Sequence, residues 1–258
     1  MEYPITNKFL QEEAKTLKDA KRMLVLANRI LANEGIFDAY GHISVRNPEN
    51  PETLLITRSL SPEFVTVDDI ITLDFEGNVV SEDKTRQSFL ERFIHCSIYR
   101  ERPDVVCVAH PHPPELITFS ATGLPYRSIY HQEVTFFEGL PVFDGIPPES
   151  GMLINNMEVA DALTKALGNK RGVLVQNHGA VIVGESIPRT IYSAITLRDG
   201  VKMLMSALLL NAEPTSISRE TQEYGMYNQY CTQALNRSWN YWNVLAKRAF
   251  SDIADLEH

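Results

Sequence analysis

The sequence predicts an α/β protein, a single-domain α/β/α sandwich with a central sheet and a helical extension at its C-terminus. Two observations lead to this fold class. Short β-branched runs alternate with amphipathic helical stretches as far as Val183, and from Ile187 onward the pattern is helical only. In addition, no internal repeat and no Gly/Ser/Pro-rich linker divides the 258 residues.

The first third of the chain predicts one helix followed by several short strands. Residues 17–33 carry apolar side chains at three- and four-residue spacing, and Gly35 follows as a helix-ending residue. Strands are expected at residues 43–45, 54–57 and 70–73, and the last continues through Glu76-Gly77-Asn78 into a hairpin partner at 79–80.

The middle of the chain alternates helices with buried strands. A helix is predicted from Phe89 to Arg100 and is stopped by Pro103, and the apolar run 105–109 then predicts a buried strand. Further elements are expected as follows: a helix after Pro114, a helix at 159–167, and strands at 173–176 and 180–183 joined by a tight turn at Asn177-His178-Gly179.

The C-terminal part is predicted to be helical, from Ile187 through residues 203–210 and in a last amphipathic stretch over 221–250. Trp239 and Trp242 lie three residues apart in that stretch. This spacing favours packing within the chain, and the functional alternative is packing against another subunit.

Composition and charge restrict the possible partners. Hydrophobic residues make up 44% and charged residues 22%, which is ordinary for a globular protein. The net charge of −9 has the wrong sign for nucleic acid or an anionic membrane. No run of eighteen apolar residues and no signal-peptide pattern occur, so we expect a soluble, cytoplasmic protein with no nucleic-acid or membrane partner. Three cysteines without CxxC spacing, Cys96, Cys107 and Cys231, are expected to be reduced core thiols.

Three histidines form the strongest chemical pattern. His110 and His112 flank Pro111 in an extended segment, where residues i and i+2 point to the same side. His178 occupies the turn after another apolar strand, so the three imidazoles can meet at neighbouring strand ends. Three neutral imidazoles can bind Zn²⁺, Fe²⁺ or Mn²⁺ and leave coordination positions open for a substrate. The alternative is a surface pair, or core histidines that are satisfied by hydrogen bonds.

Glu91 and His95 lie on the predicted helix that precedes the His110 strand. Glu91 could be a fourth metal ligand or an acid/base group, although by itself it would be an ordinary solvated helix residue. His95, one turn later, is expected to have a structural role as a helical partner of Glu91 or as a residue that supports a metal ligand.

Four motifs in order resemble the class II aldolase/adducin family, typified by L-fuculose-phosphate aldolase. They are Glu91-x-x-x-His95, Arg102-Pro103-Asp104, His110-x-His112 and Gln176-Asn177-His178-Gly179, and Gly41-x-x-Ser44 and Leu55-Ile56-Thr57 add to them. The resemblance extends from about Lys18 to Asn211. It implies an α/β/α sandwich with a mainly antiparallel sheet over residues 8–215, followed by the extension at 216–255.

The same resemblance implies a site. His110, His112 and His178 would hold one divalent metal per chain (Zn, Mn or Fe), Glu91 would be the acid/base, and the chain would form a homotetramer with active sites between subunits. His131 is a candidate substrate-binding residue contributed by a neighbouring subunit; the alternative is a structural role.

The departures from the sugar-phosphate aldolases are informative. Where those enzymes hold phosphate with small and hydroxyl-bearing residues, this sequence has Gly41-His42, Ser59-Leu60 and Phe89-Leu90. Large apolar side chains remove the exposed amide and hydroxyl groups that a phosphate site needs. His42, Arg58 and Ser59 are instead expected to bind an anionic group, because a guanidinium matches a carboxylate; for Arg58 the alternative is a surface ion pair. Together with Ser61-Pro62-Glu63, this pattern is similar to the decarboxylase branch of the family.

The leading hypothesis is a metal-dependent carbon–carbon lyase that decarboxylates a hydroxylated aromatic, heteroaromatic or ring-cleavage carboxylic acid through a metal-stabilised enolate. Three alternatives stay open: an aldolase for a substrate without phosphate, a non-heme iron oxygenase, and an adducin-like binding module with no chemistry. Such modules tend to lose the metal ligands, whereas all three histidines are present here.

Overall fold

The structure, a computed structural model, describes residues 14–211, 213–254 and 256. The expected domain start at residue 8, the end of the extension at residue 255 and the N-terminal residues used to judge a signal peptide lie outside the described residues. The division of the chain at residue 215 stays a prediction. In the described part of the chain, no helix is both long and apolar enough to cross a bilayer.

Within the described residues, seven strands form one sheet in the order β3-β2-β1-β4-β7-β6-β5. Every pair of neighbours is antiparallel except β5 and β6, which are parallel, and this confirms the predicted mainly antiparallel sheet. The strands are β1 (His42–Arg46), β2 (Thr53–Thr57), β3 (Ile70–Asp74), β4 (Cys107–His110), β5 (Val142–Phe143), β6 (Gly172–Val175) and β7 (Gly179–Gly184).

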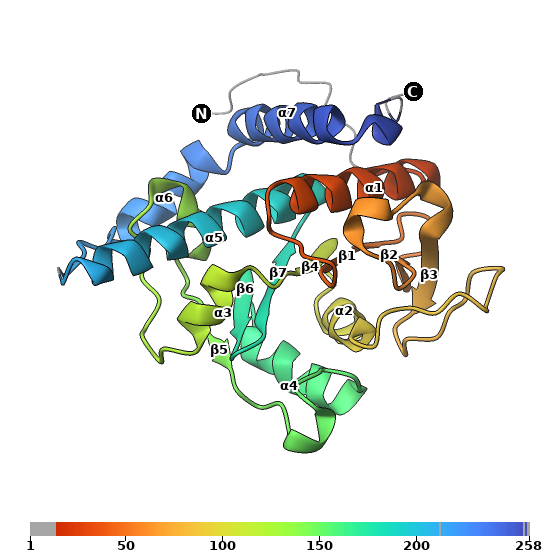
Figure 1. The fold of residues 1–258 in the computed structure, drawn as a ribbon, viewed down its shortest axis with the longest axis horizontal. Coiled ribbons are helices and arrows are strands. Elements are labelled where there is room, and N and C mark those ends of the chain that lie inside the picture. The colour runs from red at the N-terminus through yellow and green to blue at the C-terminus, as the bar shows by residue number, and fades with distance from the viewer. Residues whose placement is uncertain (1–13, 212, 255, 257–258) are drawn as a thin grey trace.

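Helices cover both faces of this sheet, so the predicted α/β/α sandwich is confirmed (Figure 1). One core cluster joins α1, α3, α5 and α7 to the sheet, and the other joins α2 and α4 to its opposite face. The helices of the described chain are α1 (Leu17–Asn33), α2 (Arg92–Glu101), α3 (Pro114–Ser120), α4 (Met157–Leu167), α5 (Ile187–Leu209), α6 (Arg219–Gln229) and α7 (Thr232–Ala249).

Strand alternation decides which side chains reach the α2 face. In β1, Ile43 and Val45 enter the core under α1, and the alternating residues His42 and Ser44 point the other way. His42 and His110 are paired across β1 and β4, so both lie at the same end of the sheet. His178 immediately precedes β7. Because β4 and β7 are antiparallel, His178 lies at that same end. The topology thus brings distant histidines to one edge.

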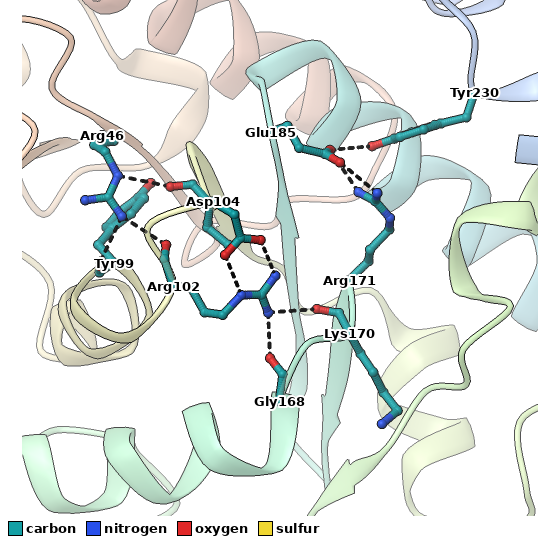
Figure 2. A network of polar contacts seen from close by, with 10 residues as sticks. Arg46, Tyr99, Arg102, Asp104, Gly168, Lys170, Arg171, Glu185 and Tyr230 are labelled. Carbon is teal, nitrogen blue, oxygen red and sulfur yellow. Dashed lines mark hydrogen bonds and ion pairs between the residues drawn. The ribbon is translucent and has the colours of Figure 1, made fainter. Parts of the chain in front are cut away.

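The opposite end of the sheet is held by arginines (Figure 2). Arg46 donates to the carbonyl oxygens of Tyr99, Val105 and Arg102, and Arg102 forms a two-pronged ion pair with Asp104. Arg171 pairs in the same way with Glu185. The Arg102-Pro103-Asp104 motif therefore fixes the fold at the end of the sheet that is far from the histidines.

Three details of the predicted elements were wrong. The helix expected from Phe89 begins at Arg92, and Glu91 stands just before it in a non-helical conformation. The stretch 221–250 forms two helices, because the chain turns at Tyr230, whose buried ring stacks against the guanidinium groups of Arg171 and Arg189. The two-residue strand β5 was not predicted, since it is too short to show a pattern.

Other expectations from the sequence agree with the structure. Trp239 and Trp242 are buried within the chain, and Trp242 contacts the ring of Tyr192. All three cysteines are free, but only Cys96 and Cys107 are buried in the core, whereas Cys231 is half-buried just before α7.

Candidate active site

His110, His112 and His178 meet at the edge of the sheet together with Glu91. One potential ligand atom from each of the four residues lies within 4.8 Å of all the others. The Nε2 atom of His110 is 3.0 Å from that of His112 and 3.2 Å from that of His178. The Oε2 atom of Glu91 lies 3.4 Å from the Nε2 atom of His178 and 3.6 Å from that of His110.

Each of the three rings uses its other nitrogen, Nδ1, as a hydrogen-bond donor. His110 donates to the carbonyl oxygen of Ala180 at 2.8 Å, and His178 donates to that of Met152 at 2.7 Å. The Nδ1 atom of His112 lies 3.3 Å from a carboxylate oxygen of Asp38. Because carbonyl and carboxylate oxygens only accept, the hydrogen of each neutral ring is on Nδ1. All three Nε2 atoms therefore direct lone pairs toward one point.

This donor set fits a divalent metal ion. Two nitrogens bound to one ion at about 2.1 Å lie roughly 3.0–3.4 Å apart, and the measured separations fall in this range. Without a positive charge between them, lone pairs at such distances repel one another. Histidine ligands with Nδ1 held by a carbonyl or carboxylate are the usual arrangement in metal sites. The set of three imidazoles and one carboxylate suits Zn²⁺, Mn²⁺ or Fe²⁺.

Glu91 is held so that one oxygen faces the histidines. Its Oε1 atom accepts a hydrogen bond from the backbone N–H of Ile154 at 2.9 Å, and only 7% of the residue is exposed. Burial raises the pKa of Glu91, but the rings of His110 and His178 lower it by more, so that its pKa lies well below the usual value. Glu91 in turn raises the pKa of His178, although burial acts in the opposite direction. The site therefore attracts a cation.

The loop before α4 contacts the cluster at two points. The carbonyl oxygen of Met152 accepts from His178, and the N–H of Ile154 donates to Glu91. Met152 and Asn177, which precedes His178, both have positive φ angles, 71° and 59°, in a region that non-glycine residues seldom occupy. Such strained positions are frequent around functional groups. This loop thus orients two of the four candidate ligands.

Gly179 lets the His110–His112 segment approach His178. A Cβ atom at this position would lie 2.4 Å from the carbonyl oxygen of Pro111 and 2.9 Å from the ring of His112. Any larger residue would push the two segments apart. The glycine of the Asn177-His178-Gly179 turn is therefore needed for the convergence of the three rings.

A second group of polar side chains lies behind the cluster. The Nδ1 atom of His42 is 2.7 Å from the Nε2 atom of His95, the Nδ1 atom of His95 is 2.7 Å from Ser44 Oγ, and Ser44 Oγ is 2.9 Å from the hydroxyl of Tyr99. All four residues are almost completely buried. Burial lowers the pKa of His42 well below its usual value and that of His95 to about 3, so both rings are neutral. His95 thus supports His42 rather than a metal ligand.

Comparison with known proteins identifies the fold family. The model of the class II aldolase and adducin N-terminal domain matches residues 22–205. The chain belongs to the class II aldolase and adducin family. It is 26% identical over 245 residues to the decarboxylase tropJ of Talaromyces stipitatus, covering 86% of this chain and 91% of that protein.

One further relative and one solved structure add to this comparison. It is 30% identical over 196 residues to 3,4-dihydroxyphthalate decarboxylase of Arthrobacter keyseri, covering 69% of this chain and 74% of that protein. The structure of L-fuculose 1-phosphate aldolase from Glaciozyma antarctica superimposes with a TM-score of 0.77 at 23% identity, over 97% of this chain and 96% of that one. The suspected resemblance to the decarboxylase branch of the family is therefore confirmed.

Arg58 is not one of the four clustered residues. It forms an ion pair with Asp69 at 2.6 Å while remaining 40% exposed. Arg58 and Ser59 line a hollow together with Thr85, Arg86 and Gln87. The register between β1 and β2, continued by two residues, places Arg58 level with His42. A role of Arg58 and Ser59 in substrate binding stays a proposal.

His131 is exposed on the 3-10 turn His131–Phe136, which packs against α5 and α6. Its ring contacts that of Tyr130, and the structure does not bring it into the four-residue cluster of the same chain. An active-site role for His131 therefore requires a second copy of the chain and stays a proposal.

Sequence reasoning missed several groups that orient the cluster. The only sequence signal for the role of Asp38 in orienting His112 was its position three residues before Gly41-His42. The carbonyl groups of Met152 and Ala180 and the N–H of Ile154 carry no residue-specific signal at all. By contrast, Glu91, His95 and Tyr99 recur every four residues, a spacing that predicts one shared side of the helix.

Proposed function

We propose that this protein is a divalent-metal-dependent carboxy-lyase that acts on a hydroxylated aromatic, heteroaromatic or ring-cleavage carboxylic acid. The observation that carries the proposal is the convergence of three Nε2 atoms and the Glu91 carboxylate on one point. Two decarboxylases among the relatives add support. A bound divalent ion would supply Lewis acidity for the electron pair that stays on carbon when carbon dioxide leaves.

His110, His112 and His178 would hold the ion, and their Nδ1 hydrogen bonds keep the three rings in place for it. Glu91 is positioned to hold and return a proton at Oε2, because Oε1 is bound to the N–H of Ile154. In decarboxylation, the bond to the carboxylate carbon breaks and carbon dioxide departs. The ionised Glu91 would take a proton from solvent water or from a hydroxyl group of the substrate and pass it to the carbon that was left with the electron pair.

The surroundings of the cluster favour a ring compound over a sugar phosphate. Phe89 stacks on His42 with ring centroids 4.5 Å apart, so an aromatic side chain fills a place where the related aldolases are expected to bind phosphate. Tyr40 and Leu90 are close in sequence to His42 and Glu91, and Met152 itself supplies the carbonyl oxygen that accepts from His178. Each of the three residues is exposed by 48–74%. An apolar rim around polar groups suits an aromatic acid.

We further propose a homotetramer with active sites between subunits, in which His131 reaches the site of a neighbouring copy. The exposed Tyr40, Leu90 and Met152 support this as well, since a neighbouring subunit could cover part of the rim. A cytoplasmic location stays a prediction from the sequence. Sedimentation velocity of the purified full chain tests the tetramer, and a monomer at micromolar concentration would contradict it.

A turnover assay on two substrates in parallel tests the proposed reaction. The purified protein with its metal is incubated with an ortho-hydroxylated aromatic carboxylic acid and, separately, with a sugar phosphate. We expect carbon dioxide from the acid and no aldehyde from the sugar phosphate. Aldehyde release without carbon dioxide would identify an aldolase, oxygen consumption would identify an oxygenase, and either result would overturn the proposal.

A further inference from the structure

The chain of buried hydrogen bonds behind the cluster determines which nitrogen of His42 carries the hydrogen. The chain starts at the carbonyl oxygen of Val106, which lies 3.3 Å from the hydroxyl of Tyr99, and continues through Ser44 and His95 to His42. Each neutral imidazole has one N–H, and each hydroxyl has one O–H. The direction of all bonds in the chain is therefore coupled.

The chain can run in either direction, and the two directions differ in the number of bonds. If Tyr99 donates to Val106, then Ser44 donates to Tyr99, His95 Nδ1–H to Ser44, and His42 Nδ1–H to His95, which gives four hydrogen bonds. In the reverse direction Ser44 donates to His95, so the single O–H of Tyr99 can serve Ser44 or Val106 but not both, and three bonds remain. A net hydrogen bond contributes about 1 kcal/mol, so the first direction is favoured.

The first direction leaves a lone pair on the remaining nitrogen of His42. This Nε2 atom makes no hydrogen bond to any described residue, although the ring of His42 lies 5.1 Å from that of His110, centroid to centroid. The Nε2 atom of His42 is also not fully buried. This nitrogen is therefore accessible beside one residue of the four-residue cluster.

We propose that His42 accepts a hydrogen bond from a free hydroxyl group of the substrate, and that Tyr99, Ser44 and His95 act as positioning residues that fix this polarity. The inference rests on the proposed function and narrows its substrate class to acids that carry a free hydroxyl group. It also changes the role expected for His42, since a nitrogen lone pair repels an anionic group and attracts a hydroxyl donor.

The variant Tyr99→Phe should reverse this polarity. It removes only the hydroxyl group and keeps the aromatic ring. Phenylalanine cannot accept a hydrogen bond from Ser44, and the buried Ser44 hydroxyl would lose its acceptor. Leaving a buried donor unsatisfied costs about 1–3 kcal/mol, so Ser44 donates to His95 instead. His95 Nε2–H then donates to His42, and the hydrogen of His42 moves to Nε2. Tyr192→Phe is a matched control, because Tyr192 lies in the other core cluster.

Nitrogen NMR of the full-length, zinc-loaded protein with ¹⁵N-labelled histidine reads this polarity directly. The His42 signals are assigned by their loss in His42→Asn. We expect an unprotonated Nε2 in the wild type and in Tyr192→Phe, and a protonated Nε2 in Tyr99→Phe. A protonated Nε2 in the wild type, or an unchanged spectrum in Tyr99→Phe, would overturn the inference.

Ligand binding gives the second readout. Calorimetry compares 2,3-dihydroxybenzoate with 2-hydroxy-3-methoxybenzoate, whose ether oxygen can accept but not donate. We expect the wild type to prefer the free hydroxyl by about tenfold, and Tyr99→Phe to lose this preference. A preference that is equal in the two proteins would overturn the inference, because simple steric exclusion of the methyl group would persist in the variant. Failure to release carbon dioxide, with the expected tautomer present, would contradict the proposed function and not the assignment of His42.

Discussion

The Nε2 atoms of His110 and His112 lie 3.0 Å apart, and each ring carries its hydrogen on the opposite nitrogen, where Ala180 and Asp38 accept it. Two nitrogen lone pairs at this distance are stable when a cation lies between them. The adjacent Glu91 carboxylate adds negative charge to the same point. The arrangement of these four groups therefore fits a divalent metal ion, as the proposed function requires.

Asp38 should contribute to metal affinity although it does not face the metal. Asp38→Asn keeps an oxygen that can accept from the Tyr40 and Gly41 N–H groups but removes the charge that orients His112. Changes of such supporting residues typically lower metal affinity by about 10–100-fold. Competition with a chelator, followed by elemental analysis, measures this. An affinity equal to that of the wild type would show that His112 is oriented without Asp38.

Glu91→Gln should retain the metal but lower kcat at least about a hundredfold, the usual contribution of a positioned acid/base group. Glutamine can still accept from the N–H of Ile154, so the loop before α4 should keep its position. Elemental analysis and steady-state kinetics on the same sample test both halves of this prediction. Unchanged turnover would leave Glu91 with a structural role only.

Arg58 is predicted to bind a carboxylate of the substrate. Arg58→Ala should lower kcat/KM by on the order of 2 kcal/mol, and Arg58→Lys should restore only part of it, because an ammonium lacks the planar fork. Asp69→Asn is the matched control, since it breaks the ion pair and leaves the guanidinium in place. If Asp69→Asn reduced kcat/KM as strongly as Arg58→Ala, Arg58 would act only by holding Asp69.

Glu133 should make stability depend on pH. It is completely buried beside Tyr126 and Ser128, and burial raises its pKa to about 8, whereas in the unfolded chain it is near 4.5. Between these values the unfolded state releases the proton and the folded state keeps it. Its stabilising contribution is therefore fully present below about pH 4.5 and is lost as the pH rises to about 8.

Glu133→Gln stays neutral in both states and should remove this loss. Its stability relative to the wild type should increase from pH 5 to pH 8 by on the order of 3 kcal/mol, measured by urea unfolding. The exposed Glu220→Gln serves as a control with no such trend. A constant difference between Glu133→Gln and the wild type over this range would show that Glu133 is ionised in the folded protein.

The sequence predicts the parts of the site that depend on periodicity. Alternation along an extended segment placed His110 and His112 on one side, and the apolar run before His178 indicated a neighbouring strand end. The helix before β4 was also predicted, but its start was wrong by three residues, because Glu91 leaves the helical conformation while its side chain faces the histidines. A helix start that is set by such a side-chain contact has no sequence signal.

Contacts made by backbone groups of distant segments could not be predicted. Met152 orients His178 with its carbonyl oxygen, a group that every residue has, from a loop 26 residues away in the chain. The sequence indicated only that Arg58 could form a surface ion pair. Its partner Asp69 lies beside it because β2 pairs with β3. In both cases the fold, and not the residue type, decides the contact.

The most direct test of the account is to locate the metal itself. Crystals of the full chain, grown with Zn²⁺ or Mn²⁺, should give one anomalous peak per chain. The peak should lie at bonding distance from the Nε2 atoms of His110, His112 and His178, with Glu91 beside it. His178→Ala should lose the peak and its metal, whereas His131→Ala should keep both. A wild-type protein without a peak at this point, or a His178→Ala protein with full metal content, would contradict the central claim that these residues form a catalytic metal centre.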